Sequence, residues 1–160
     1  MDIENQVPED GHPEDAHKNA DSWLLCAVLQ AGEGTDGATL GRIIEAGDAL
    51  KQAMFNQEEL IGGIERLAAA GLIKFRNETV YSTQKVAPLI ETFTKRRDAF
   101  KRLEEAEHFL HELPAPVETE ATAREVERAR QLATSENIRE AMKEYHVKSR
   151  QAAQKRKGTK

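Results

Sequence analysis

The 160-residue chain has little of several residue types, and each shortage excludes a class of protein. Its single cysteine, Cys26, rules out an intrachain disulfide framework and any cysteine-based zinc finger, and its apolar neighbours predict a buried thiol. Aromatic residues make up only 5% of the chain, so the core must be modest and mostly aliphatic. No apolar run approaches the roughly 18 residues of a membrane span, and no secretory signal pattern opens the chain. We therefore expect a cytoplasmic protein with no membrane partner.

The charge of the chain is unevenly distributed. Residues 1–20 hold six acidic residues against one lysine, whereas residues 146–160 hold six basic residues and no acidic one. Because the total is −5, the segment between these two ends carries −6. Phosphate contacts dominate affinity for DNA, so an acidic body opposes DNA binding and the basic charge lies mainly in the final tail.

Apolar residues in the first half of the chain recur at the three-to-four spacing of amphipathic helices. We expect helices over about 22–31 and about 40–47, and a third that begins after Asn56 and ends before Gly71. Asn56 and Glu59 have the spacing of a capping box. Gly71 is the expected residue after the helix end, because glycine readily adopts the left-handed conformation needed there.

Two short strands follow the third helix. Residues 72–76 and 79–83 flank Asn77-Glu78, and this pattern predicts two short strands joined by a tight turn. Three helices followed by a hairpin is the element order of a winged helix-turn-helix domain. The sequence resembles that superfamily in four stretches, Glu58-Glu59-Leu60, Ile64-Glu65-Arg66-Leu67, Gly71-Leu72-Ile73 and Tyr81-Ser82-Thr83.

This resemblance covers about 60 residues. It implies a mainly α fold with a small β-hairpin, in which the exposed face of the third helix enters the DNA major groove. The expected organisation is a disordered acidic tail over 1–20, a winged-helix domain over 21–83, a long helix over 84–113, a linker over 114–119 and a helical extension with a basic tail over 120–160.

The resemblance makes double-stranded DNA the first candidate partner. On the third helix, Gln57 and Arg66 have side chains able to read base edges. Phosphate contacts are expected from Lys74 and Arg76 on the hairpin and from Arg96 and Arg97 on the long helix, which completes the predicted DNA-binding set. Glutamates on the same third helix would be repelled by phosphates, so the alternative is a winged-helix adaptor that binds or pairs proteins without DNA.

The long helix is expected to mediate a homodimer. Phe93, Phe100, Leu103 and Leu110 lie at spacings of seven, three and seven, which places them near one side of a helix. A helix of about 25 residues spans roughly 37 Å, more than a small domain can cover. A second copy would cover the remaining stripe, and the competing interpretation is that residues 120–150 fold back over it.

Two further patterns suggest chemistry that the surrounding sequence does not support. Residues 32–37 match G-x-G-x-x-G, but a helix rather than a strand precedes them, so we interpret them as an inter-helix loop. His108 and His111, with Glu105, could offer metal ligands on one helix face, but no second ligand helix is evident. We therefore expect no metal, no cofactor and no enzymatic activity.

Overall fold

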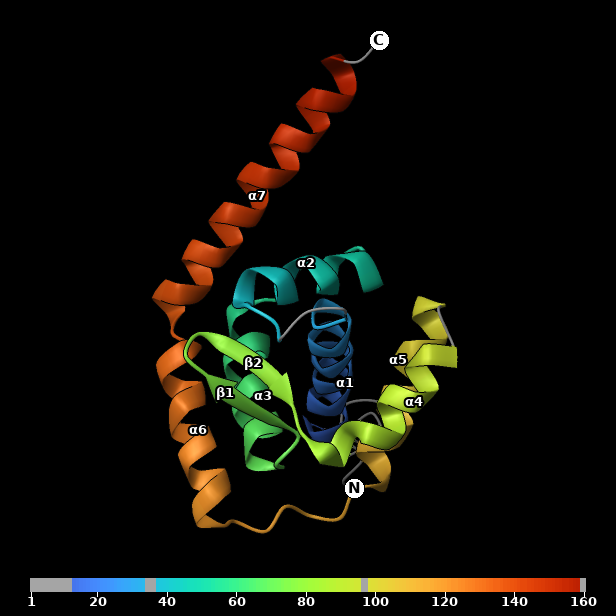
Figure 1. The fold of residues 1–160 in the computed structure, drawn as a ribbon, viewed down its shortest axis with the longest axis vertical. Coiled ribbons are helices and arrows are strands. Elements are labelled where there is room, and N and C mark those ends of the chain that lie inside the picture. The colour runs from blue at the N-terminus through green and yellow to red at the C-terminus, as the bar shows by residue number, and fades with distance from the viewer. Residues whose placement is uncertain (1–12, 34–36, 96–97, 159–160) are drawn as a thin grey trace, which may run out of the picture.

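The structure, a computed structural model, describes residues 13–33, 37–95 and 98–158, and is mainly helical with one small antiparallel sheet (Figure 1). The elements in chain order are α1 (Pro13–Ala31), α2 (Leu40–Lys51), α3 (Gln57–Ala69), β1 (Ile73–Arg76), β2 (Thr79–Ser82), a 3₁₀ turn (Gln84–Val86), α4 (Ala87–Lys95), α5 (Ala99–Glu112), α6 (Glu120–Leu132) and α7 (Ser135–Gly158). The expected mainly α composition with a small β-hairpin is confirmed.

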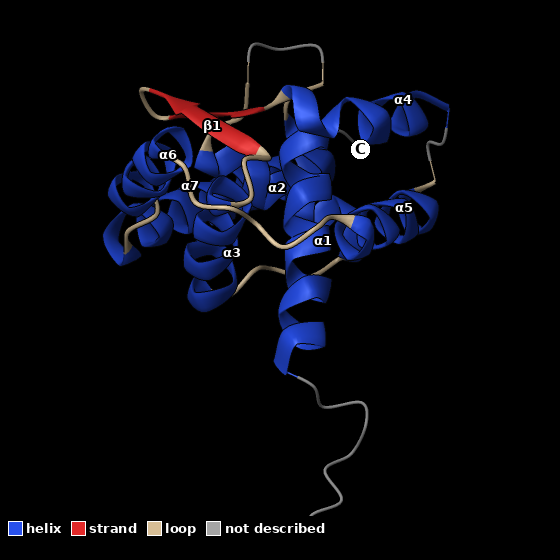
Figure 2. Cartoon of the chain, turned by 90° about the horizontal axis from the view of Figure 1, so that it is seen from below, coloured by secondary structure: helices blue, strands red, loops and turns tan. Residues whose placement is uncertain are grey.

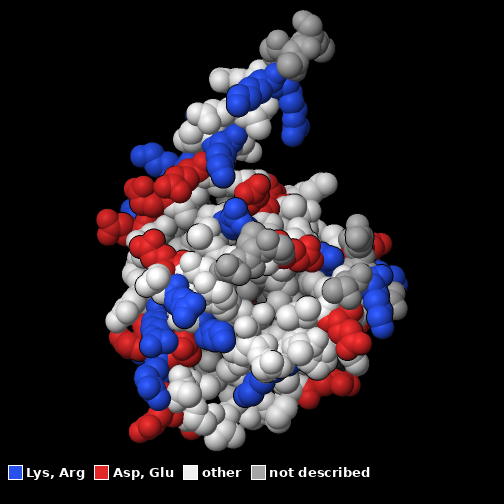
Figure 3. All heavy atoms as spheres, in the orientation of Figure 1, with Lys and Arg blue, Asp and Glu red and all other residues white. Residues whose placement is uncertain are grey.

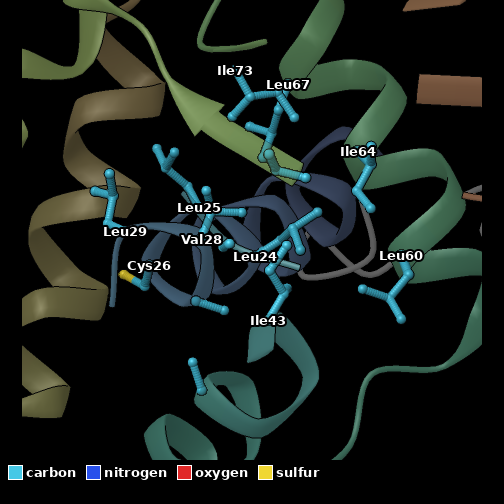
Figure 4. Close-up of a cluster of buried hydrophobic side chains, with 14 of the residues drawn as sticks. Leu24, Leu25, Cys26, Val28, Leu29, Ile43, Leu60, Ile64, Leu67 and Ile73 are labelled. Atoms are coloured by element: carbon cyan, nitrogen blue, oxygen red, sulfur yellow. The ribbon is translucent and has the colours of Figure 1, made fainter. Parts of the chain in front are cut away.

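Helix α1 lies at the centre of the fold, with α2, α3 and α5 packed around it (Figures 1 and 2). Every residue from Asp21 to Leu29 is buried, as expected for a helix enclosed on all sides. Figure 4 shows how α1 meets its neighbours in the core, where the labelled side chains are Leu24, Leu25, Cys26, Val28 and Leu29 of α1, Ile43 of α2, Leu60, Ile64 and Leu67 of α3, and Ile73 of β1.

Both ends of α3 form as the sequence predicts. The Asn56 side chain accepts a hydrogen bond from the Glu59 backbone N–H at 2.7 Å, and the Glu59 side chain accepts one from the Asn56 N–H at 2.9 Å. Gly71 has a φ of +75°, and the N–H of Leu72 donates to the carbonyl of Leu67 at 3.0 Å. This backward bond closes the last turn of the helix.

The hairpin pairs β1 with β2 in antiparallel register, with Phe75 opposite Val80 on the buried face. Asn77 takes a left-handed φ of 57° in the turn, a conformation that asparagine tolerates better than most residues. A third segment joins the sheet, because Ala38, between α1 and α2, exchanges hydrogen bonds with Val80 at 2.8 and 2.9 Å. The hairpin is thereby tied to the start of α2.

The expectation of a disordered tail over residues 1–20 is wrong for residues 13–20. Helix α1 begins at Pro13, well before the start expected near residue 22, and residues 1–12 lie outside the described part of the chain. Proline is tolerated in the first helical turn, so Pro13 is compatible with this start. The helix continues from there into the stretch that is buried from Asp21 to Leu29.

The expectation of one long helix over residues 84–113 is also wrong. The segment forms α4 and α5, which lie side by side (Figure 2). Helix α5 begins at Ala99 and is capped by Asp98, whose side chain accepts a hydrogen bond from the Phe100 N–H at 2.9 Å. The break is held by Arg102, which is 8% exposed and donates to the Phe93 carbonyl at 3.1 Å. Burying this guanidinium against the end of α4 requires the chain to turn back.

The final segment has the predicted order of a linker and then a helical extension. The extension is divided into α6, which ends at Leu132, and α7, which begins at Ser135. Helix α6 packs on α3 and β1, and the first half of α7 packs on α2. The second half of α7 projects beyond the body (Figure 1). The segment therefore does fold back, but over α3 and α2 instead of the predicted dimerisation stripe. Its buried contacts are Ala129, Leu132, Ala133, Ile138 and Ala141.

Candidate nucleic-acid interface

Helix α3, the predicted DNA-reading helix, is enclosed between α1 and α6. On the α6 side, Arg130 donates from Nε and Nη2 to Oε1 of Glu65, at 3.1 and 2.7 Å. These bonds join α6 to the side of α3 that carries Glu65. In this conformation the helix cannot enter a groove along that face, because α6 occupies the space.

Arg66 is committed to an ion pair within the fold. Its Nε donates to Asp21 Oδ2 at 2.8 Å and its Nη2 to Asp21 Oδ1 at 2.9 Å. The hydrogen bond to Asp21 is the main cause of the raised pKa of Arg66. Gln57, the other predicted base reader, is half-buried at the opposite end of α3. The two residues are nine positions apart, so α3 does not present them as one contact surface.

Of the two adjacent glycines of α3, Gly63 is explained by the approach of a neighbouring helix. A Cβ at Gly63 would meet the Leu24 side chain of α1 and, at 3.2 Å, Oδ1 of Asp21. A Cβ at Gly62 would meet only the end of the flexible Arg66 side chain. Glycine at 63 thus allows α1 and α3 to pack closely, which offsets its low helix propensity.

The hairpin keeps its two predicted cations on the surface. Lys74 and Arg76 are exposed on the outer face of β1, opposite Tyr81 and Thr79 of β2. The free edge of β1 is covered by α6, where Glu125 accepts the Phe75 N–H at 2.9 Å. Figure 3 shows basic side chains over this region, interspersed with acidic ones. The hairpin alone therefore offers two cations in a surface of mixed charge.

The structure does not bring the predicted DNA-binding set together. Lys74 and Arg76 lie on the hairpin, Gln57 and Arg66 on an enclosed helix, and Arg96 and Arg97 lie outside the described residues. For Gln57 and Arg66 the reason is that α1 and α6 pack on either side of α3.

The most uniform positive surface is the projecting half of α7. Every residue from 146 to 157 is exposed, and this stretch contains no acidic residue (Figures 1 and 3). The acidic residues of α7 all lie in its first half. The basic tail was evident in the sequence, but its helical form and projection from the body were not. Its cations are Lys148, Arg150, Lys155, Arg156 and Lys157.

The predicted dimerisation residues do not form one uncovered stripe. Phe93 is 3% exposed and belongs to the core, while Leu103 and Leu110 pack partly against it. Phe100 is 65% exposed. The break between α4 and α5 directs these side chains to different surroundings. The predicted continuous apolar stripe along one helix is therefore wrong.

Three other features of the sequence were candidates for chemistry: Cys26, the histidines of α5 and the loop over residues 32–37. Burial raises the pKa of the Cys26 thiol to about 12, which keeps it protonated and unreactive. Of the two histidines considered as ligands, His108 lies 3.3 Å from Glu112. Among the described residues, no three His, Cys, Asp or Glu side chains gather to hold a metal. The loop with the G-x-G-x-x-G pattern lies partly outside the described residues.

None of the described helices is long and apolar enough to cross a membrane. In comparisons with known proteins, the chain matches no family model, and no curated protein and no solved structure is significantly similar to it.

Proposed function

We propose that the chain is a cytoplasmic nucleic-acid-binding protein of winged-helix type whose phosphate contacts come mainly from the projecting half of α7. The observation that carries this proposal is an exposed helical segment with five cations and no acidic residue between 146 and 157. Polyanions bind such surfaces by releasing condensed counterions. The acidic body would keep the rest of the protein away from phosphates.

The order and pairing of the elements support the winged-helix part of the proposal. Helices α1 to α3 precede a hairpin, and Ala38, between the first two helices, forms an isolated antiparallel bridge with Val80. The capping box and the Gly71 helix end set the length of α3, as in the sequence resemblance. A winged-helix frame here would act as a support for α6 and α7.

The covering of α3 supports a second candidate, a winged-helix adaptor that binds proteins without DNA. The observation that favours it is the Arg130–Glu65 contact, through which α6 covers one side of α3. Because α3 here packs against a helix of the same protein, the domain would bind protein helices and not DNA. Self-association through the exposed Phe100 belongs to this second candidate.

Retention on non-specific duplex DNA at increasing salt separates the two candidates. The full chain is compared with a Lys155→Gln, Arg156→Gln, Lys157→Gln variant and with a control variant, Arg42→Gln, Lys101→Gln, Arg124→Gln. Both variants lose three exposed cations and therefore the same net charge. We expect the first to lose most of its retention and the control to keep it.

The salt dependence gives a second readout. If about five phosphates are contacted, the logarithm of the binding constant falls with the logarithm of salt with a slope of about −4 to −5. No retention of the full chain at low salt would refute nucleic-acid binding and favour the adaptor. Equal loss in both variants would show that general charge, and not α7, governs retention.

A further inference from the structure

We infer that the basic half of α7 lies lengthwise in the major groove of B-form duplex DNA and contacts phosphates of both strands. This inference rests on the proposed function and adds to it the kind of nucleic acid and the mode of contact. The segment is a continuation of α7 whose residues 146–157 are all exposed. It therefore reaches a ligand as a preformed helix beyond the folded body.

The cations of this segment form two rows on opposite sides of the helix. Lys148 and Lys155 are seven residues apart, as are Arg150 and Lys157. Seven residues return to within about 20° of the same side, so each pair makes a row about 10 Å long. Two residues advance a helix by about 200°, which sets the second row across the axis from the first.

Two opposed rows match a groove with a phosphate backbone on either side. The major groove of B-form DNA is about 12 Å wide and admits an α-helix. A helix lying along its floor has one strand on each flank, so each row would meet its own strand. A flat phosphate surface, by contrast, would leave one row facing solvent.

The faces between the rows differ in size. One carries the small side chains Ser149, Ala152 and Ala153, while the other carries Val147 and Gln154. The small side chains surround Arg156 at the centre of the first face, so the Arg156 side chain is the one that extends toward the groove floor. The guanidinium of Arg156 can donate hydrogen bonds to base edges or to phosphates.

The chemistry of the segment disfavours other polyanionic surfaces. Membrane-surface helices need a broad apolar face, but Val147 is the only large aliphatic residue between 146 and 157. Double-stranded RNA has a deep and narrow major groove that side chains and helices do not enter. B-form DNA is therefore the expected ligand.

The test measures fluorescence anisotropy of labelled duplexes of one sequence, as DNA and as RNA, with the full chain and paired variants. Lys148→Gln with Lys155→Gln removes one row, and Arg150→Gln with Lys157→Gln removes the other. We expect at least tenfold weaker binding to RNA than to DNA. Each row variant should weaken DNA binding and lower the salt slope by about 2, because each row supplies about two phosphate contacts.

A second pair of variants tests the orientation without changing charge. Ala152→Phe places a bulky ring on the face directed to the groove floor. Gln154→Phe lies two positions, or about 200°, further round the helix and places the same ring on the opposite face. We expect the first to weaken DNA binding several-fold and the second to leave it nearly unchanged. Circular dichroism of each variant checks that α7 remains helical.

The outcomes separate this inference from the proposed function. Any of three results would overturn the groove assignment and leave nucleic-acid binding intact. They are equal affinity for DNA and RNA, a row variant that does not weaken DNA binding, and equal effects of the two phenylalanine variants. Absence of any DNA binding by the full chain would overturn both.

Discussion

Arg66 of α3 and Asp21 of α1, 45 residues apart, form a two-point ion pair with both nitrogen–oxygen distances below 3 Å. The Asp21 side chain is 10% exposed, whereas that of Arg66 is 40% exposed. The pair therefore joins the central helix to the predicted DNA-reading helix at the edge of the core. An arginine that the sequence suggests for base recognition thus serves the fold.

Replacing Asp21 by Ala should destabilise the protein. The change removes both acceptors of the Arg66 guanidinium and leaves it half-buried without its carboxylate. We expect a loss of about 1–2 kcal/mol in the free energy of unfolding, toward the lower part of the range for charged hydrogen bonds because Arg66 is partly solvated. Urea denaturation measures it. As a control, Glu58→Ala removes an exposed acidic residue from α3, the helix that carries Arg66, and should change stability by less than about 0.5 kcal/mol. A similar loss in both variants would contradict a specific role for the pair.

Two glycines of α2 should respond oppositely to alanine. A Cβ at Gly47 would overlap the ring of Phe55, which stacks on Trp23 with ring centroids 3.8 Å apart. We expect Gly47→Ala to cost about 1–3 kcal/mol by overpacking. At Gly41 nothing lies within 4 Å of the added atom, so Gly41→Ala should gain up to about 1 kcal/mol from helix propensity. Thermal unfolding of both variants measures the difference, and a destabilised Gly41→Ala would count against this packing.

Tyr145 should titrate above the ordinary tyrosine range. Its hydroxyl donates to Asp48 of α2, and this hydrogen bond, followed by desolvation and the Asp48 charge, raises its pKa. Because the folded-state pKa lies above the unfolded value of about 10, the contact stabilises the fold fully below that pH. The stabilisation is lost as the pH rises through the raised folded-state pKa.

Ultraviolet absorbance of tyrosinate measures this titration in a Tyr81→Phe variant, in which Tyr145 is the remaining tyrosine. Adding Asp48→Asn should bring the midpoint down toward the ordinary value. An unchanged midpoint in that second variant would show that α7 does not pack on α2 through this contact.

Phe93 and Phe100, both predicted as dimer contacts, should behave differently. Phe93 is 3% exposed and lies under Arg102, whose guanidinium carbon is 5.0 Å from the ring centroid. We expect Phe93→Ala to cost about 3–5 kcal/mol, as for other buried aromatics. Phe100→Ala should stay within about 0.5 kcal/mol. Sedimentation of the Phe100→Glu variant then tests self-association separately from stability, and equal stability losses at the two positions would contradict the break between α4 and α5.

Local features of the fold follow from residues close together in the chain. The start and end of α3 depend on Asn56, Glu59 and Gly71, whose partners lie within a few positions, so their spacing predicts them. The hairpin turn at Asn77 and the interruption before Ser135 are local in the same sense. The sequence by itself therefore determined both ends of α3, and it also concentrated the basic charge at the end of the chain.

Tertiary contacts decided the candidate site. The pairing of Arg66 with Asp21, of Glu65 with Arg130 and of Arg102 with the Phe93 carbonyl each joins different helices. The spacing of apolar residues along one helix does not predict which distant segment will pack on it, because the burial of a helix face depends on the shape and charge of its partner. For that reason the sequence could place cations on the third helix and on the tail, whereas only the packing of α6 and α7 decided that the third helix is covered and the tail projects.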